Sequence, residues 1–211
     1  MKTAEFRIIK PEIRVLGVDD GAFLHGQKDL VDVVGVVFRG GYWLDGFMKT
    51  EVEVDGFDAT SKIASMVLKS SHYEQIRVVI LDGVTFAGFN VVDITLLSEE
   101  LKLPVISVTR EKPNMDEVRK ALEKLPNFHR RWQTITRAGE AIEVRDYKPG
   151  CVVYIQLAGI TLKDAREIIR KTATRSCLPE ALRVAHIIAS GLSKRGRKDL
   201  KARNSMERRR S

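Results

Sequence analysis

Two largely apolar segments place the strongest constraint on how this chain can fold. Ile76 to Leu81 and Pro104 to Thr109 lack the alternation of polar and apolar residues found in half-exposed strands, so both faces of each strand are expected to be covered, as in α/β sheets. A helix over Asn90 to Leu101 is expected between them. Ligands bind such sheets beyond the carboxyl ends of strands, and Asp82 directly follows the first segment. We therefore expect Asp82 to belong to a functional site.

A second carboxylate stands at a matching place. The strand expected over Ile13 to Val18 leads into Asp19 and Asp20, and because successive strand side chains point to opposite faces, only one of the two can face a given site. Asp19 and Asp82 at two strand ends predict a divalent-metal site, with Mg²⁺ or Mn²⁺ as the ion. Asp20 is a candidate second ligand or outer partner. The competing interpretation is that such aspartates are turn or cap residues.

The remaining elements follow from hydrophobic periodicity and turn residues. In chain order they are expected as strands over Val31 to Phe38 and Tyr42 to Val54, helices over Asp58 to Lys69 and Asn114 to Lys124, a hairpin of Trp132 to Thr136 with Ala141 to Arg145, a strand over Cys151 to Gln156, and helices over Thr161 to Thr172 and Pro179 to Leu192. Three antiparallel strands followed by alternating helices and strands predict an α/β fold. We expect a ribonuclease H-like mixed sheet, three antiparallel strands plus parallel strands, flanked by helices.

Charge is distributed unevenly along the chain. The sequence holds 36 Lys+Arg and 28 Asp+Glu, a net charge of +8, yet residues 193–211 alone hold nine basic and two acidic residues. We expect a single domain over residues 1–192 and a basic, flexible tail over 193–211. The tail either binds nucleic acid through counterion release or aids solubility, and both interpretations stay open. Its candidate contacts to a nucleic-acid backbone are Lys194, Arg195, Arg197 and Lys198.

The sequence also bears on compartment and redox state. No segment reaches the roughly 18 apolar residues of a membrane helix, and the N-terminus lacks the apolar core of a signal peptide. A cytoplasmic protein without membrane contact is expected. Cys151 and Cys177 lack metal-site spacing, so they are expected to be reduced and packed as small hydrophobic residues.

Several blocks of sequence resemble a known family. Four segments resemble the motifs of endonuclease V in order and approximate spacing: Gly17-Val18-Asp19, Leu81-Asp82-Gly83, Pro104 to Arg110, and Leu178 to His186. That enzyme uses a metal ion to nick DNA or RNA near deaminated purines. The run Phe86 to Ile94 is similar to the archaeal endonuclease dU family, which is related to endonuclease V and acts on deoxyuridine in DNA. The resemblance covers roughly residues 12–190.

The resemblance implies roles for three residues. Asp19 and Asp82 match the metal ligands on the first and fourth strands of endonuclease V. Arg110 stands where the relatives carry a lysine near the scissile phosphate; it keeps the positive charge, although its planar fork differs from an ammonium group. These three are the expected catalytic residues.

Other family positions are not matched. Ala59 stands at the place of the family's helix glutamate, and Gly159 stands at the place of the family's histidine after the last strand. Asp58 is the nearest carboxylate to the missing glutamate, so it is a further candidate ligand, with a helix N-cap as the competing interpretation. The Pro-Tyr wedge that helps expose a damaged base has no counterpart before Asp58. The number of metal ions therefore stays open.

The turn after Asp82 is the candidate base pocket. A nuclease that recognises one base flips it out, stacks it and reads its edge through hydrogen bonds. Glycines let the backbone approach the base, the phenylalanines stack, and the asparagine reads an edge. The candidate residues are Gly83, Phe86, Gly88, Phe89 and Asn90. Asn90 is equally well explained as the cap of the following helix, with Asp93 at the capping-box position.

Further cations and histidines are weighed in the same way. Lys112 is a candidate contact to the nucleic-acid backbone, as are Arg130 and Arg131 in a His-Arg-Arg-Trp run that resembles strand-tracking surfaces. The end of a solvated hairpin explains this run equally well. His25 is expected on a surface loop, and His186 is expected as a buried histidine on an amphipathic helix.

The sequence thus predicts a metal-dependent endonuclease that nicks DNA with a deaminated base, with deoxyuridine as the leading substrate. Phosphodiester hydrolysis needs charge neutralised on the nonbridging oxygens and an activated water, and a carboxylate-held cation supplies both. The alternatives are a noncatalytic nucleic-acid-binding relative, which the missing glutamate and histidine would suit, and a ribonuclease acting on RNA. The oligomeric state is not accessible from the sequence.

Overall fold

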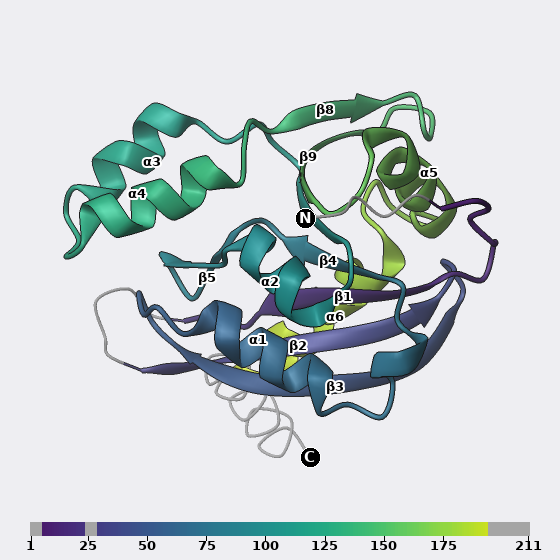
Figure 1. Cartoon of the computed structure of the whole chain (residues 1–211), viewed down its shortest axis with the longest axis horizontal. Helices are drawn as coiled ribbons and strands as arrows, with labels where there is room; N and C mark the ends of the chain where they lie inside the picture. Colours follow the sequence, from purple (N-terminus) through teal and green to yellow (C-terminus); the bar gives the residue numbers. More distant parts are fainter. Residues whose placement is uncertain (1–5, 24–28, 194–211) are drawn as a thin grey trace, which may run out of the picture.

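A computed structural model describes residues 6–23 and 29–193 of the chain (Figure 1). Within these residues, seven strands form one sheet in the order β3-β2-β1-β4-β7-β9-β8. Its strands are β1 (Arg14–Asp20), β2 (Leu30–Arg39), β3 (Trp43–Glu53), β4 (Val78–Asp82), β7 (Val105–Thr109), β8 (Ile142–Arg145) and β9 (Val152–Ala158). A separate small hairpin pairs β5 (Thr85–Phe86) with β6 (Asn90–Val91).

The helices are α1 (Ala59–Leu68), α2 (Ile94–Leu101), α3 (Met115–Leu122), α4 (Phe128–Arg137), α5 (Leu162–Thr172) and α6 (Glu180–Leu192), with a short 3-10 turn at Tyr73–Gln75. None of the described helices has the length and hydropathy needed to cross a membrane.

Three central strands run parallel and the outer strands run against them. β1, β4 and β7 are parallel neighbours, whereas β2 pairs antiparallel with β1, and β3 with β2. On the other side of the sheet, β9 runs antiparallel to β7 and β8 antiparallel to β9. The prediction of three antiparallel strands plus parallel strands flanked by helices is therefore confirmed.

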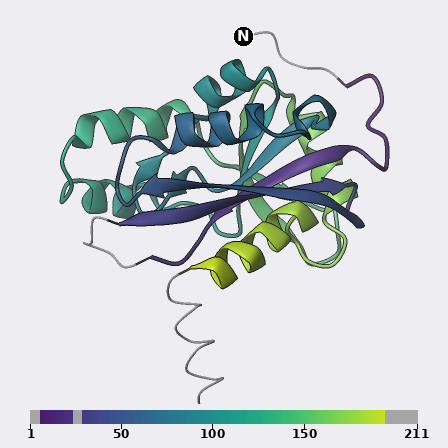
Figure 2. The ribbon, with the colours of Figure 1, turned by 90° about the horizontal axis from the view of Figure 1, so that it is seen from below.

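The sheet is covered on both faces, which explains its apolar central strands. Val15 and Ile80 pack with α5 and α6 on one face, whereas Leu16 and Leu81 pack with α1 and α2 on the other. In Figure 2 the yellow α6 lies on one side of the sheet and the blue α1 on the opposite side. Because alternate strand residues point to opposite faces, this arrangement decides which face each residue at a strand end can serve.

The prediction of a hairpin formed by Trp132 to Thr136 and Ala141 to Arg145 is wrong for its first strand. Trp132 to Thr136 belongs to α4, while the second half is confirmed as β8, which pairs with β9. The segment Trp-Gln-Thr-Ile-Thr is rich in aromatic and β-branched residues, which are favoured in strands. The helix wins because Phe128, Trp132 and Ile135 recur at helical spacing; the rings of Phe128 and Trp132 stack at 6.2 Å, Ile135 is buried, and α4 packs against α3.

The prediction of two reduced cysteines is also wrong. Cys151 and Cys177 form a disulfide, with their Cα atoms 5.2 Å apart. The fold brings the start of β9 beside the segment that leads into α6. The Tyr147 hydroxyl also donates to the Cys177 carbonyl at 2.6 Å, and the Lys148 ammonium donates to the Thr174 carbonyl at 2.9 Å. This side of the molecule is thus tied both covalently and by hydrogen bonds.

Some predictions fall on residues that the structure does not describe. His25 lies within residues 24–28, and Lys194, Arg195, Arg197 and Lys198 lie within residues 194–211. Their roles, and the division into a domain over 1–192 and a tail over 193–211, stay predictions.

Candidate metal centre

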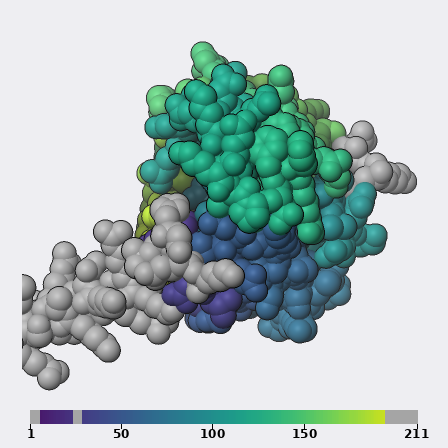
Figure 3. All heavy atoms as spheres, turned by 90° about the vertical axis from the view of Figure 1, so that its left-hand side faces the viewer, coloured from purple at the N-terminus to yellow at the C-terminus, as the bar shows by residue number. Residues whose placement is uncertain are grey.

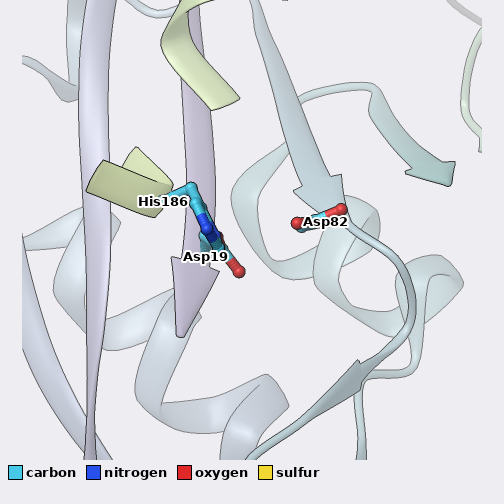
Figure 4. A group of neighbouring side chains, drawn as sticks. All are labelled: Asp19, Asp82 and His186. Carbon is cyan, nitrogen blue, oxygen red and sulfur yellow. The ribbon is translucent and has the colours of Figure 1, made fainter. Parts of the chain in front are cut away.

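Two carboxylates and one imidazole meet at the carboxyl end of the central strands. Asp19 is the second-last residue of β1 and Asp82 is the last residue of the neighbouring parallel strand β4, and both point to the face of the sheet that α6 covers. His186 projects from α6 toward them (Figure 4). One ligand atom from each residue lies within 4.8 Å of the others. Oδ2 of Asp19 and Nδ1 of His186 are 2.7 Å apart.

Gly17 in β1 and Gly21 directly after it allow α6 to come close enough for this contact. Gly17, Asp19 and Gly21 lie on the same face of the strand because they are two residues apart. A Cβ atom added to Gly17 would lie 2.3 Å from the carbonyl carbon of Ala181, and one added to Gly21 would lie 2.9 Å from the carbonyl oxygen of Ala189. A glycine within a strand often marks such a close approach. His186 lies between these two contacts along the helix, directly over Asp19.

The two carboxylates, one buried on Asp19 and one half-buried on Asp82, repel one another. Asp19 is 4% exposed, and this burial, together with the negative charges of Asp82 and Asp20, raises the pKa of Asp19 to about 7 even though the bond to His186 opposes the shift. Burial also raises the pKa of Asp82, against the positive fields of His186 and Arg110. Both shifts mean that the site disfavours its own negative charge.

This arrangement fits a divalent cation. A cation would neutralise the repelling carboxylates, and two carboxylate oxygens suit Mg²⁺ or Mn²⁺, whereas the imidazole nitrogen favours a transition metal such as Mn²⁺ over Mg²⁺. Asp19, Asp82 and His186 are therefore the residues that could hold a metal ion.

Asp20 points to the opposite face and serves the turn that follows β4. Its Oδ2 accepts a hydrogen bond from the backbone N–H of Ala87 at 2.7 Å, and burial raises the pKa of Asp20 to about 6. Asp55 holds the same turn, because its Oδ1 accepts from the N–H of Phe89 at 2.8 Å and fills the space beside Gly88. Gly88 adopts a φ of +88°, which is why glycine suits this position. The structure does not bring Asp20 into the metal group.

Asn90 and Asp58 form a separate buried junction. The Asn90 Oδ1 accepts from the N–H of Ala59 at 3.0 Å, and its Nδ2 donates to the Glu53 carbonyl and to the Asp58 Oδ1. Asn90 thus caps α1, and the predicted cap of the following helix by Asn90 is wrong. Asp58 occupies the N-cap position of α1 without a side-chain capping bond. It lies outside the metal group.

The helix after the turn has its own cap. α2 begins at Ile94, and the Asp93 side chain accepts from the N–H of Leu96. Asp93 is therefore the N-cap, not the residue of a capping box that begins at Asn90.

The turn supplies only part of the predicted base pocket. Phe86 is fully buried in the core between the sheet, α1 and α2, so its ring is not available for stacking. Asn90 is fully buried, and both ends of its amide are hydrogen-bonded within the protein. Gly88 and Phe89, both half-buried, are the predicted pocket residues that retain access, whereas Gly83 is buried.

The predicted cations have different environments. Arg110 and Lys112 are exposed directly after β7, and the charge of Arg110 acts on Asp82. Arg130 is exposed on α4. The prediction that Arg131 contacts a nucleic-acid backbone is wrong, because its side chain is only 2% exposed. The guanidinium donates to the carbonyls of Pro126, Gly56, Phe89 and Asp55.

His186 is the site residue that analysis of the sequence missed. It was expected as a buried histidine, yet its side chain is 60% exposed and faces Asp19. His186 closes the segment Leu178 to His186, whose resemblance to endonuclease V could have indicated a functional role. The amphipathic pattern of the helix could not, because it does not show that this flank of the helix adjoins a strand end 167 residues away.

A mixed sheet of this topology, with carboxylates at the ends of two adjacent parallel strands, defines a ribonuclease H-like protein. The sequence profile of the family described as endonuclease dU matches residues 11–193. The chain therefore belongs to the endonuclease dU family.

Known relatives and structures agree with this assignment. A protein of the archaeon Methanothermobacter thermautotrophicus is 51% identical over 92% of this chain and 94% of its own. The crystal structure of a protein of unknown function from Archaeoglobus fulgidus matches with a TM-score of 0.76 and 38% identity, covering 86% of this chain and 98% of that one.

Endonuclease V structures share the fold. The Bacillus subtilis enzyme matches with a TM-score of 0.60 and 13% identity, covering 96% of this chain and 88% of that one. The Ciona intestinalis enzyme, in complex with a 24mer DNA containing an inosine followed by a ribo-adenosine, matches with a TM-score of 0.55 and 15% identity, covering 90% and 86%. The predicted ribonuclease H-like fold and the predicted family are both confirmed.

Proposed function

We propose that this protein is a metal-dependent endonuclease that nicks DNA at or near a deaminated base, with deoxyuridine as the preferred lesion. The observation that carries the proposal is the group of Asp19, Asp82 and His186 at the ends of two central strands, in a chain of the endonuclease dU family. The family description supports deoxyuridine as the substrate, and the DNA held by the Ciona enzyme supports DNA as the partner.

The geometry supports a proposed role for each residue of the site. Asp19, Asp82 and His186 would hold Mg²⁺ or Mn²⁺, and the 2.7 Å contact between the His186 Nδ1 and the Asp19 Oδ2 would keep these two side chains together. A bound cation supplies charge neutralisation on the nonbridging phosphate oxygens and a more acidic water. Arg110, exposed beside Asp82, offers a second positive charge to the phosphate. Asp20 and Asp55 position the turn beside the metal group through the N–H groups of Ala87 and Phe89.

The base is proposed to meet the same turn. Gly88 leaves backbone accessible to a flipped base, and Phe89 is the remaining ring of the turn that could stack on it, whereas Gly83 is buried and shapes the turn from within. Lys112, exposed after Arg110, is proposed to contact the strand backbone. We place this activity in the cytoplasm, as expected from the sequence.

One observation weighs against the noncatalytic alternative. The noncatalytic alternative was based partly on the absence of the family's histidine, whose place is taken by Gly159. In the structure, His186 on α6 brings an imidazole to the carboxylates instead. The missing glutamate is not replaced among the described residues, because the metal group holds no side chain from α1. Two carboxylates and an imidazole still provide a cation with three protein ligands and room for waters.

Cleavage of labelled DNA tests the proposal. Oligonucleotides carrying one deoxyuridine, one deoxyinosine or no modified base, and matched RNA, are incubated with Mg²⁺, Mn²⁺ or EDTA. We expect a metal-dependent nick near deoxyuridine for the wild type and loss of the nick for Asp82→Asn. Glu99→Gln, which removes an exposed carboxylate on α2, is the matched control and should cleave normally. Absence of any nick with retained DNA binding would establish the noncatalytic alternative instead, and cleavage of RNA alone would establish a ribonuclease.

A further inference from the structure

Positive charge on the folded body is concentrated in one segment. Residues 110–137, from the end of β7 through α4, hold eight basic and four acidic residues, whereas the other residues of 1–192 hold 19 basic and 22 acidic ones. The segment forms the α3–α4 helical hairpin. Figure 3 looks onto this end of the molecule, where the teal and green hairpin lies over the blue part of the chain. Such a distribution favours a polyanionic partner on this side.

The hairpin is fixed to the body at one buried point. Arg131 on α4 donates to the carbonyls of Asp55 and Gly56 in the segment before α1, and to the carbonyl of Phe89 in the turn after β4. Four carbonyl acceptors hold one guanidinium that is almost fully buried, and α4 also contacts β6. The position of α4 relative to the turn beside Asp82 is therefore set by direct bonds.

A groove lies between α4, the start of α1 and the length of α2. It has a volume of about 370 Å³, within the range of roughly 300–1,000 Å³ typical of small-ligand sites. One wall is a stripe of α4 at helical spacing, Arg130, Gln133, Thr134 and Arg137, and the facing walls include Phe57 and Thr60. We call this the α4 groove.

The α4 groove is lined by two arginines, two carboxylates (Asp93 and Glu100), one amide and several hydroxyl groups. Arg137 is neutralised by Asp93 at 2.7 Å, but among the described residues Arg130 forms no ion pair. The Arg130 guanidinium carbon lies 4.4 Å from the centroid of the Phe57 ring, which holds the cation at the mouth of the groove. An unpaired guanidinium, an amide and hydroxyl groups beside an exposed ring suit a phosphate together with a sugar or base.

We propose that the α4 groove binds a nucleotide of the substrate strand at a distance from the scissile phosphate, with Arg130 on a backbone phosphate and Gln133 on the sugar or base. This proposal rests on the proposed function and extends it to the path of the strand. The proposed path would run from the metal group on the α6 side, around the carboxyl end of β4 along the turn of residues 83–90, to the groove on the side of α1 and α2, since Val91 follows that turn directly and lines the groove. The groove would also give the enzyme affinity for DNA on one side of the lesion.

The test is DNA binding by fluorescence anisotropy in EDTA, so that no cleavage occurs, with deoxyuridine oligonucleotides over a range of salt concentrations. We expect Arg130→Ala to weaken binding by about tenfold and to lower the slope of log affinity against log salt by about one. Arg130→Lys should keep the slope, because it keeps the charge. Gln133→Ala should weaken binding without a change in slope.

The matched control is Arg119→Ala, which removes an exposed arginine of α3 on the same hairpin. It should leave affinity nearly unchanged. The effect of Arg130→Ala should also vanish when the oligonucleotide is shortened on one side of the lesion and persist when it is shortened on the other.

Two failures can be told apart. If Arg130→Ala and Gln133→Ala bind as the control does while the wild type nicks DNA, the groove proposal is overturned and the proposed function stands. If the wild type binds DNA through the groove but never cleaves it, the proposed function fails and the groove proposal stands.

Discussion

Asp19 can be neutralised in two ways, by a proton or by a cation. Its pKa of about 7 and the pKa of about 6 for Asp20 both lie well above the value of 3.8 for a free aspartate. Between the pKa of a free aspartate, 3.8, and the pKa of Asp19, about 7, the folded state therefore binds more protons than the unfolded chain. Under linkage, the stability of a protein falls with rising pH wherever the folded state binds more protons. The same negative charge that would attract a metal thus destabilises the metal-free fold at neutral pH.

Metal-free protein should therefore melt at a higher temperature at about pH 5 than at about pH 7.5, by a contribution from these groups of the order of 3 kcal/mol. Asp19→Asn should melt at a higher temperature than the wild type at the upper pH and depend less on pH. Mg²⁺ or Mn²⁺ should restore stability to the wild type more than to the variant. Thermal unfolding monitored by circular dichroism measures each quantity, and an identical pH dependence in both proteins would contradict the argument.

Single residues differ in how far the sequence predicts them. Asp19 and Asp82 follow apolar strands, so their place at one sheet edge could be predicted from topology alone. His186 and Arg131 could not be, because an amphipathic pattern shows that a helix has a buried face but not what lies beside its flanks. Arg131 resembled a surface cation because it follows Arg130, yet it is buried among carbonyls that belong to distant segments.

At the scale of elements, the packing of α6 on β1 decides whether the site exists. The helix backbone lies directly over Gly17, with the Leu182 nitrogen 2.4 Å from where a Cβ atom would be. Backbone atoms cannot move aside singly, so the whole helix would have to shift. His186 would then move away from Asp19 along with it.

Gly17→Ala should cost about 1–3 kcal/mol in the free energy of unfolding and should weaken metal binding beyond that loss of stability. Gly191→Ala is the matched control, because Gly191 also lies on α6 but has open space at its Cβ position. The control should be neutral, or stabilising by up to about 1 kcal/mol through helix propensity. Urea unfolding and calorimetric titration with Mn²⁺ measure the two effects. Normal metal affinity in folded Gly17→Ala would show that helix position does not set the site.

The elements themselves were largely predictable. Strands and helices with a clear apolar period were placed correctly to within a few residues, as with β4, expected over Ile76 to Leu81 and observed over Val78–Asp82. The prediction for α4 failed because its aromatic and β-branched residues favour a strand, whereas the spacing of its apolar residues and its packing against α3 and β6 favour a helix. Propensity and pattern within a segment do not specify the neighbour that decides between them.

For the whole molecule, the disulfide is the feature that the sequence did not predict. Cys151 and Cys177 are 26 residues apart and belong to different elements, so their proximity depends on the packing of β9, α5 and the segment before α6. The bond lies at the base of α6, the helix that carries His186.

Cys151→Ser combined with Cys177→Ser should lower the free energy of unfolding by about 3 kcal/mol, the value expected for a closed loop of this length. A reductant should shift the urea midpoint of the wild type in the same direction and leave that of the double variant unchanged. A wild-type midpoint that does not respond to a reductant known to have broken the bond would show that the disulfide adds nothing to stability.

The metal group joins the first strand of the sheet to the last described helix, and this has a consequence for how the protein is made. A chain emerging from the ribosome exposes its N-terminal elements first, so Asp19 and Asp82 can be in place on their strands well before α6 exists. The imidazole, and the helix that buries Asp19, arrive only when residues 180–192 have been released. A nascent or prematurely terminated chain would therefore carry both aspartates without the complete centre. Under the proposed function, such a chain could not yet cut DNA, and cleavage would begin only after α6 has been synthesised.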